Sequence, residues 1–426
     1  MIRLSHLPLT LRLAAAAALC GALALPATAA TTAIVNATIF TADQAGALTG
    51  ATLVMRDRQI VAVGRGVTVP PGATIIDGTG KTVTPGLFAA ASAVGASEIE
   101  AVASTNDRGS NHKRYSAALD IADAFNPLSI SIPIARVEGI TRAMVTPAAR
   151  AGARVLLGQG PVVSLGSTND WLTKPRAAMF AEFGSTAAAN SGTRATMVLE
   201  LREAFEEVRV AGLPQKSAPN LDSLLSSLDI AALRPVLQGL VPLVVTADRA
   251  SDIQAVLRLA RQYKLRVVIN SGAEAWIVAR ELAAAKVPVI VDPELVLPVD
   301  FENLAARGDN ARLLHEAGVM VVLNASSSQI RTLRNLRQLA GNAINNGLDP
   351  AAALAAITIN PAKVYGVDKQ LGSLVAGKLA DVVVWDGDPF EVTSYPSAVF
   401  IAGERMPTTT RQSALADKYM RMHKLR

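Results

Sequence analysis

Short apolar segments alternate with helical segments through the middle of this chain. The segments expected to be strands are Thr141–Thr146, Pro242–Ala247, Arg266–Asn270, Val287–Val291 and Val319–Leu323. The expected helices are Thr193–Val210, Ser251–Tyr263, Ala273–Ala284, Asn303–Ala317 and Leu333–Asn346. Such alternation is typical of a parallel sheet or barrel whose strands are each followed by a covering helix. A chain of 426 residues is long enough for a large barrel with an accessory domain.

Short strands and turns occupy both flanks of this middle region. On the N-terminal side, Ala33–Phe40 alternates in polarity, Ala51–Val63 contains two short strands, and Thr74–Lys81 adds a strand and a glycine-rich turn. On the C-terminal side, Val382–Trp385 and Ala398–Ala402 have the same character. Closely spaced short strands indicate a small β unit. We therefore expect residues 31–84 and 369–408 to pair into one β-sandwich domain.

The first 30 residues have the pattern of a secretory signal peptide. Arg3 and Arg12 supply positive charge, Leu13–Leu25 is apolar, and Ala27–Ala29 has the small-x-small form of a cleavage site. We expect cleavage near Ala29 or Ala30, and hence a periplasmic or secreted protein. The alternative is an uncleaved membrane anchor, for which the apolar run is short. Elsewhere no segment is long and apolar enough to span a membrane.

Charge and composition exclude some partners. The net charge of +6 falls to +4 when the signal's two arginines are removed. Aromatic residues make up only 4% of the chain, so stacking platforms for nucleic acid are scarce. Neither property favours nucleic acid as a partner. The one cysteine, Cys20, lies in the signal, so the mature chain has no disulfide and no thiolate chemistry.

The chain carries a set of short motifs at Pro85–Leu87, Ala356–Ala362, Gly372–Leu374, Gly377–Asp381 and Trp385–Pro389. These motifs resemble those of the amidohydrolase superfamily, in particular its imidazolonepropionase-like and prolidase-like branches. The resemblance implies an α/β fold with a (β/α)8 TIM-like barrel over residues 85–368, and it leaves residues 409–426 as a basic tail. It also implies the reaction of that family, the metal-dependent hydrolysis of non-peptide or dipeptide C–N bonds.

The positions where the resemblance implies metal ligands carry other residues. The family's first strand has the pattern PGLIDxHxHxG, and Ala91 and Ala93 stand at its two histidines. Thr246 and Ser271 stand at later histidines, and Ser326 stands at the aspartate that orients water. No lysine between Lys113 and Lys174 can serve as the bridging lysine of some branches. We therefore expect no cofactor and no intact metal site.

A count of histidines that needs no alignment leads to the same expectation. The chain contains His6, His112, His315 and His423, and His6 is lost with the signal. His315 is expected on an outer helix and His423 in the basic tail. Only His112, in a loop, is placed to reach the mouth of the barrel. A hydrolytic zinc site needs three well-placed protein ligands and an oriented water.

Polar residues are expected at the carboxyl ends of the strands, where barrels carry their functional groups. Ser92, Asn270, Ser271 and Asn324 are candidates for binding a ligand, and Asp248, Asp292 and Ser326 are candidates for catalysis. An all-oxygen set of this kind can hold Mg²⁺ or Ca²⁺, bind a small polar ligand, or simply face water. Asp292–Glu294 can alternatively form a turn or a helix cap.

Two functions remain open. The first is a pseudoenzyme that has lost the metal centre and binds a small ligand or an active paralogous subunit, as a homo-oligomer or a hetero-complex. The second is an active C–N hydrolase with a rearranged site that uses Asp248, Asp292 and possibly His112, with zinc or another divalent metal. The tail Arg411–Arg426 is expected to be a terminal helix that docks on a partner or an acidic surface, or a solvated end.

Overall fold

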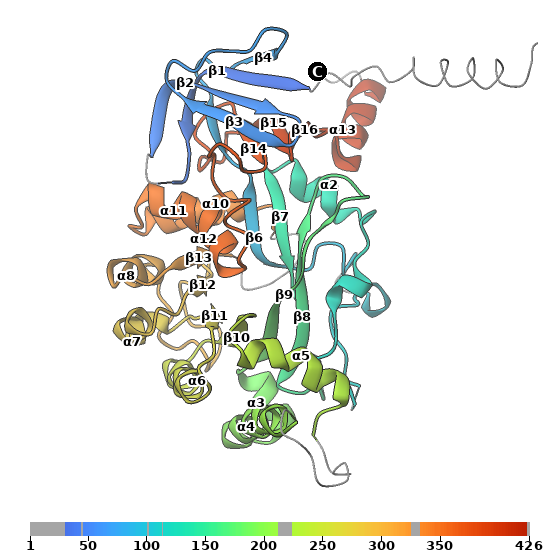
Figure 1. Cartoon of the computed structure of the whole chain (residues 1–426), viewed down its shortest axis with the longest axis vertical. Helices are drawn as coiled ribbons and strands as arrows, with labels where there is room; N and C mark the ends of the chain where they lie inside the picture. The colour runs from blue at the N-terminus through green and yellow to red at the C-terminus, as the bar shows by residue number, and fades with distance from the viewer. Residues whose placement is uncertain are drawn as a thin grey trace, which may run out of the picture.

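The strands form two eight-stranded sheets, shown in the computed structural model of Figure 1. The structure describes residues 30–43, 46–99, 102–112, 114–211, 224–324 and 333–423. The strands of the first sheet are β1 (Thr31–Phe40), β2 (Ala47–Arg56), β3 (Gln59–Gly64), β4 (Thr74–Asp77), β5 (Thr82–Pro85), β14 (Val382–Trp385), β15 (Pro396–Ile401) and β16 (Glu404–Arg405). Those of the second are β6 (Leu87–Ser92), β7 (Ile140–Val145), β8 (Leu156–Ser164), β9 (Leu172–Glu182), β10 (Leu243–Ala247), β11 (Val267–Ser271), β12 (Val289–Val291) and β13 (Val321–Leu323).

Helices follow the strands of the second sheet and cover its outer face (Figure 1). The α-helices are α2 (Ser131–Arg136), α3 (Ser185–Ser191), α4 (Arg194–Val210), α5 (Ser227–Leu237), α6 (Ala250–Tyr263), α7 (Ala279–Ala284), α8 (Asn310–Glu316), α10 (Leu336–Asn345), α11 (Pro350–Ala356), α12 (Ile359–Val364) and α13 (Arg411–Met422). The 3-10 turns are η2 (Ala103–Thr105), η3 (Ile121–Ala124) and η4 (Ala275–Val278). In the part of the chain that the structure describes, we find no helix with the length and apolar character needed to cross a membrane.

The first sheet joins the two ends of the chain, as the sequence predicts. β5 and β14 pair antiparallel, with Pro85 opposite Val382 and Thr82 opposite Trp385. β1 pairs with β4 through its first half and with β5 through its second half. The strands β16, β15, β14, β5, β1, β2 and β3 follow one continuous hydrogen-bonded path, and β4 pairs with β1 beside it, so they form one sheet rather than the two separate sheets of a sandwich. This sheet encloses its own apolar core.

The second sheet is the predicted barrel, with one departure from regular βα alternation. Its strands run in the order β13 to β6, and the neighbours from β9 to β13 are parallel, as are β6 and β7. β8 is antiparallel to both β7 and β9. This hairpin was not expected, because two glycines and a proline interrupt the apolar pattern of β8. Gly160 is required there, since a Cβ on it would lie 2.4 Å from the carbonyl oxygen of Val145.

The expected strands of the middle region are all present, but two expected helices are shorter. Of the expected helix Ala273–Ala284, only Ala279–Ala284 is α-helical, and Ala275–Val278 before it is a 3-10 turn. Only Asn310–Glu316 of the expected helix Asn303–Ala317 is helical. The side chain of Asn303 accepts hydrogen bonds from the backbone N–H groups of Val299 and Asp300, at 2.8 and 3.1 Å. These bonds hold the preceding segment in a turn. Within the expected helix, the carbonyl oxygen of Ala305 accepts from the Trp276 side chain at 2.9 Å, whereas a helix would bond it to the N–H of Asp309.

Side chains close the barrel where β13 meets β6, the two ends of the strand order. The amide of Asn324 accepts from the N–H of Ala91 at 3.2 Å and donates to the carbonyl oxygen of Ala91 at 2.9 Å, as an added strand residue would. Tyr365 donates to the carbonyl oxygen of Ala90 at 2.5 Å, and Asn360 donates to that of Val321 at 2.8 Å. We call this contact the barrel seam. Asn360 belongs to the motif Ala356–Ala362, so this part of the motif has a structural role.

We predict that Asn324→Ala destabilises the protein by about 2–6 kcal/mol. Asn324 is buried, and its loss leaves the buried N–H and C=O of Ala91 without these partners, at about 1–3 kcal/mol for each group. The matched control is Asn270→Ala, because the Asn270 amide donates to a side chain, the hydroxyl of Thr246. We expect that control to lower the free energy of unfolding by less than about 1 kcal/mol. Urea denaturation measures both, and equal losses would contradict the role of Asn324.

Candidate functional site

A row of polar side chains continues the apolar lining of the barrel at its carboxyl end. Phe180, Val244 and Val268 lie in the apolar cluster that fills the barrel. Because side chains alternate along a strand, the residues two positions later face the same way. These are Glu182, Thr246 and Asn270, which stand in register on the adjacent strands β9, β10 and β11.

Hydrogen bonds connect the members of this row. The Asn270 amide donates to the Thr246 hydroxyl at 3.2 Å. The Thr246 side chain in turn hydrogen-bonds Glu182, which holds the pKa of that carboxyl lower than its burial alone would. The row is therefore one connected chain that ends on a carboxyl group.

Asp248 lies just beyond β10 and is positioned by the end of β11. One of its oxygens accepts from the backbone N–H of Ala273 at 3.0 Å, and its side chain also bonds that of Ser271. Ser271 has a φ of 76°, in the left-handed region that residues other than glycine rarely adopt. Backbone strain of this kind is found where surrounding structure holds a residue in place.

The loop after β12 brings Asp300 and Glu302 toward these groups. Both carboxylates act on Asp248 electrostatically, and Glu302 also acts on Glu182. The carboxyl groups of Glu182 and Glu302 also lie close to the same backbone position, Gly184. If Gly184 had a Cβ atom, that atom would be 3.0 Å from Oε1 of Glu182 and 4.0 Å from Oε2 of Glu302. We call Glu182, Asp248, Asp300 and Glu302 the carboxylate cluster.

Negative charge exceeds positive charge in this cluster. Burial, followed by the charge of Asp248, raises the pKa of Glu182 to about 7. Burial also raises the pKa of Asp248. Arg194 forms ion pairs with Glu302 and, at 3.0 Å, with Asp252. Its single positive charge is therefore shared between two negatively charged carboxylates. Oε2 of Glu302 is buried and makes no hydrogen bond to any described residue.

The structure places the predicted ligand-binding residues near strand ends, but their side chains bond the protein itself. Ser92 donates to the carbonyl oxygen of Met144 at 2.9 Å. Asn270 and Ser271 bond Thr246 and Asp248, and Asn324 lies in the barrel seam. These polar groups therefore position the mouth of the barrel and its carboxylates.

The residues predicted to be catalytic do not lie together in the structure. Asp248 belongs to the carboxylate cluster, whereas Asp292 accepts from the N–H of Glu294 at 2.8 Å and forms the turn considered above. Ser326 lies outside the described residues. His112 is exposed, and its ring stacks on Tyr115 with centroids 5.1 Å apart. His315 and His423 are exposed on α8 and at the end of α13.

Sequence reasoning missed Glu182, Arg194, Asp300 and Glu302. Glu182 was overlooked because β9 was not expected to be a strand. The apolar run Ala177–Phe183, interrupted only by Glu182, is the signal that could have revealed it. Nothing local marks Arg194 or Glu302, since they meet only through the fold.

The residues present do not fit the metal centre that the resemblance implies. Ala91 and Ala93 are buried methyl groups with no lone pair to donate, and Thr246 and Ser271 offer neutral hydroxyls. Zinc sites use histidine nitrogen, cysteine sulfur and carboxylate oxygen. Over the described ranges, no three His, Cys, Asp or Glu side chains gather as a metal site.

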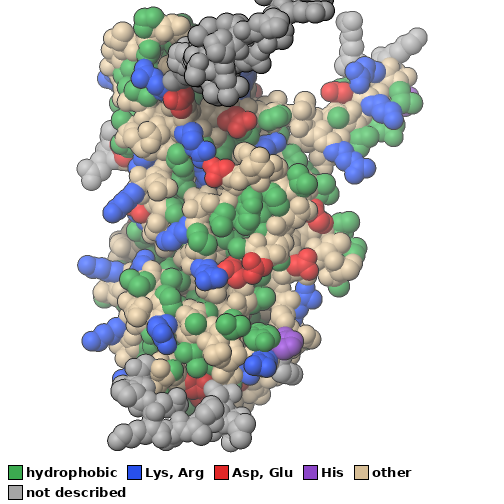
Figure 2. Space-filling view, turned by 45° about the vertical axis from the view of Figure 1, so that its right-hand side comes forward, with side chains coloured by type: hydrophobic (Ala, Val, Ile, Leu, Met, Phe, Trp, Pro, Cys, Tyr) green, Lys and Arg blue, Asp and Glu red, His purple; other side chains and the backbone are tan. Residues whose placement is uncertain are grey.

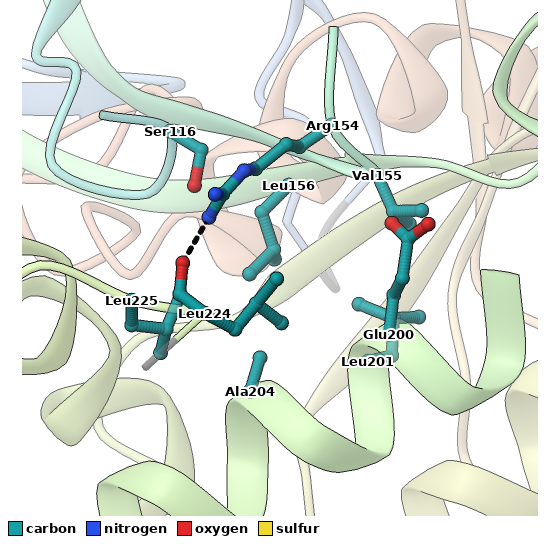
Figure 3. Close-up of a pocket in the computed structure, with 9 residues that line it drawn as sticks. All are labelled: Ser116, Arg154, Val155, Leu156, Glu200, Leu201, Ala204, Leu224 and Leu225. Atoms are coloured by element: carbon teal, nitrogen blue, oxygen red, sulfur yellow. Dashed lines mark hydrogen bonds between the residues drawn. The ribbon is translucent and has the colours of Figure 1, made fainter. Parts of the chain in front are cut away.

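A separate cavity beneath α4 is too small to be a binding site. Figure 3 shows it between Leu156 and Leu225, with Arg154 donating to the carbonyl oxygen of Leu224. Its volume of about 10 Å³ is room for a single water. The buried hydroxyl of Ser116 on its wall has no hydrogen-bond partner among the described residues, which suits that role.

Comparison with known proteins gives matches over the barrel and the C-terminal strands. Residues 259–411 match the model described as the amidohydrolase family. The amidohydrolase tasK of Hapsidospora irregularis is 23% identical over 79% of this chain and 37% of its own length. The imidazolonepropionase of Shouchella clausii is 39% identical over 25% of this chain and 24% of its own length.

Solved structures match almost the whole fold. The crystal structure of an amidohydrolase from Thermotoga maritima is 27% identical, with a TM-score of 0.79, and the match covers 88% of this chain and 99% of that one. A prolidase structure, 17% identical with a TM-score of 0.54, covers 88% of this chain and 99% of its own and shares the fold. The matches to the amidohydrolase tasK and to the imidazolonepropionase are shorter, because this chain spans well under half the length of each of those two curated relatives.

We predict that the protein becomes more stable as the pH falls from about 7 to about 4.5. In this window the folded protein holds a proton on Glu182 that the unfolded chain has released, because the pKa is near 7 when folded and 4.5 otherwise. The penalty above pH 7 is about 3 kcal/mol at most. Glu182→Gln removes it, so we expect this variant to be stabilised at pH 8 and little changed at pH 4.5.

Thermal and urea unfolding at both pH values measure this effect. The control is Glu203→Gln, an exposed glutamate on α4 whose loss also removes one negative charge. If both variants show the same pH dependence as the parent protein, Glu182 is not the group that titrates.

Proposed function

Because this chain belongs to the amidohydrolase family, we propose that it is a pseudoenzyme of that family that binds a small cationic ligand at the carboxylate cluster. The observation that carries this proposal has two parts. The carboxyl groups of Glu182, Asp248 and Glu302 are largely buried with too little positive charge beside them. The family's metal positions lack metal-ligating side chains. The barrel fold of the family is retained, and the excess of negative charge at its mouth supports the binding of an organic cation where the histidine ligands of a metal are absent.

An ammonium or guanidinium group suits this cluster. Such groups offer several N–H donors and a positive charge, and charge-assisted hydrogen bonds to carboxylates are among the stronger ones in proteins. Glu182 and Asp248 lie at the ends of adjacent strands, so one cation can be shared between them. Binding would favour the ionised form of Glu182 and lower its pKa. Ligand binding below pH 7 is therefore expected to release a proton.

We predict that small free amines bind and that their acetylated forms bind at least 10-fold more weakly. Suitable probes are arginine, putrescine and dipeptides with a free amino terminus, each compared with its N-acetylated form by isothermal titration calorimetry. Glu182→Gln and Asp248→Asn should each weaken amine binding about 10-fold, whereas Glu203→Gln should not. Equal binding of free and acetylated probes, or no binding by any of them, would contradict the proposed ligand. Stoichiometric, tightly held transition metal in purified protein would contradict the loss of the metal centre.

A second candidate function follows from the raised pKa of Glu182. A carboxyl group that titrates near pH 7 is suited to act as a general acid or base. Glu182 and Asp248 could then assist hydrolysis of a small amide without a metal ligand set, in place of Asp292 and His112. Turnover of any dipeptide or cyclic amide that Glu182→Gln abolishes would favour this alternative, and its absence across such substrates favours binding alone.

We also propose that the protein is exported to the periplasm or secreted after cleavage near Ala29 or Ala30. In support, β1, the first strand among the described residues, starts at Thr31, directly after the predicted cleavage site. The expected N-terminal residue of the mature protein is Ala30 or Thr31. Intact-mass analysis of protein recovered from the periplasm or medium tests this, and a full-length mass or an exclusively intracellular protein would contradict it.

A further inference from the structure

The terminal helix α13 forms with well-defined ends but packs none of its side chains into the body. It begins at a capping box in which the Thr410 and Ser413 side chains each accept from the other's backbone N–H, at 3.1 and 2.9 Å. None of its residues is buried. Figure 1 shows it beside β16, and in Figure 2 it stands out from the molecule at the upper right. A helix this short gains most of its stability from packing, so α13 is suited to a partner.

One side of α13 is apolar and its charge is basic. Leu415, Tyr419 and Met422 follow the i, i+4, i+7 spacing that forms a single stripe along a helix. Their exposed fractions are 40%, 54% and 63%. Along the helix, three bases stand against one acid: Arg411, Lys418 and Arg421 against Asp417.

The loop from Glu294 to Leu304 has the complementary properties. We call it the acidic loop. Its large apolar side chains are strongly exposed, with 69% for Leu297, 75% for Val299 and 84% for Phe301. It contains the acids Glu294, Asp300 and Glu302 and no base.

The acidic loop is held in place rather than free. Its turn is bonded by Asn303, and Glu302 is paired with Arg194 of α4. Its exposed apolar surface is therefore presented by a defined backbone. Exposed apolar patches of this kind commonly mark protein interaction sites.

The two surfaces cannot meet within one chain. Figure 1 places α13 beside β16 and α2, on the other side of the molecule from β12 and α8, between which the acidic loop runs. We propose that α13 of one copy of this protein docks on the acidic loop of a second copy, with the stripe of Leu415, Tyr419 and Met422 against Val299 and Phe301. Opposite charges then flank an apolar contact.

A second copy accounts for more of these observations than an anionic lipid surface does. A membrane would attract the bases of α13, but it would leave the exposed apolar residues of the acidic loop uncovered and would repel its acids. The proposed contact is head-to-tail, because different surfaces of the two copies meet. Such contacts close into rings or extend into open chains.

Charge-swapped variants of the full chain test the proposal. Sedimentation velocity and light scattering at about 1–100 µM should show that the parent protein associates and that association weakens as salt is raised. Arg411→Glu with Lys418→Glu and Arg421→Glu should abolish association, and so should Glu294→Arg with Asp300→Arg. Mixing these two variants should restore it, since opposite charges again face each other.

Apolar substitutions and a matched control complete the experiment. Tyr419→Ser and Phe301→Ser each remove an exposed side chain, so the fold should be retained, as circular dichroism can confirm, while association weakens at least 10-fold. Glu203→Arg, an exposed change on α4, should leave association unaltered. A parent protein that is monomeric at 100 µM, or association that none of these variants alters, would overturn the proposal. So would a monomeric protein that binds phosphatidylglycerol vesicles through α13.

Discussion

The barrel seam is the contact on which the rest of this structure depends. β13 and β6 are the two ends of the strand order, and a barrel must join its ends to avoid exposed backbone groups. Here the amide of Asn324 takes the place of a backbone neighbour for Ala91, and Tyr365 and Asn360 add further bonds on either side. Because the seam holds the carboxyl ends of the strands together, it also sets the positions of the groups at the mouth. Ala91 is one of the positions where the family resemblance implies a metal ligand. In this protein its backbone N–H and carbonyl oxygen bond Asn324 and so help to close the barrel.

A second constraint joins the barrel to the sheet built from the two ends of the chain. Arg142 of β7 binds Asp381 through two hydrogen bonds of 2.6 and 3.0 Å, and both side chains are 5% exposed. Asp381 also accepts from the N–H of Ala402 at 2.8 Å, so its charge is well matched despite burial. Removing one partner of such a buried pair leaves an uncompensated charge, which is strongly destabilising. Asp381 is a residue of the motif Gly377–Asp381, and like Asn360 it acts here through structure rather than chemistry.

Much of the fold was predictable because it depends on local pattern. The strands at Pro242–Ala247 and Arg266–Asn270 and the helix Ser251–Tyr263 follow from apolar periodicity, and the structure confirms them. The hairpin of β8 and β9 was not predictable in this way, since its glycines serve close backbone approaches that only the assembled barrel creates. Missing β9 meant missing Glu182. The segment Asn303–Asp309 was wrongly expected to be helical. The carbonyl oxygen of Ala305 there accepts from the Trp276 side chain, a contact that only the assembled fold creates.

The sequence by itself determined the barrel, the union of the two chain ends in one sheet, and the side chains at the family's metal positions, because these depend on residue identity and short-range spacing. Tertiary structure alone decided which charges meet. Glu182, Asp248 and Glu302 come from segments spread over 120 residues of the chain, and the barrel gathers their carboxyl groups at one mouth. The pKa of Glu182 rises to about 7 because of burial and those neighbours, and neither can be read from the residues around it in the chain.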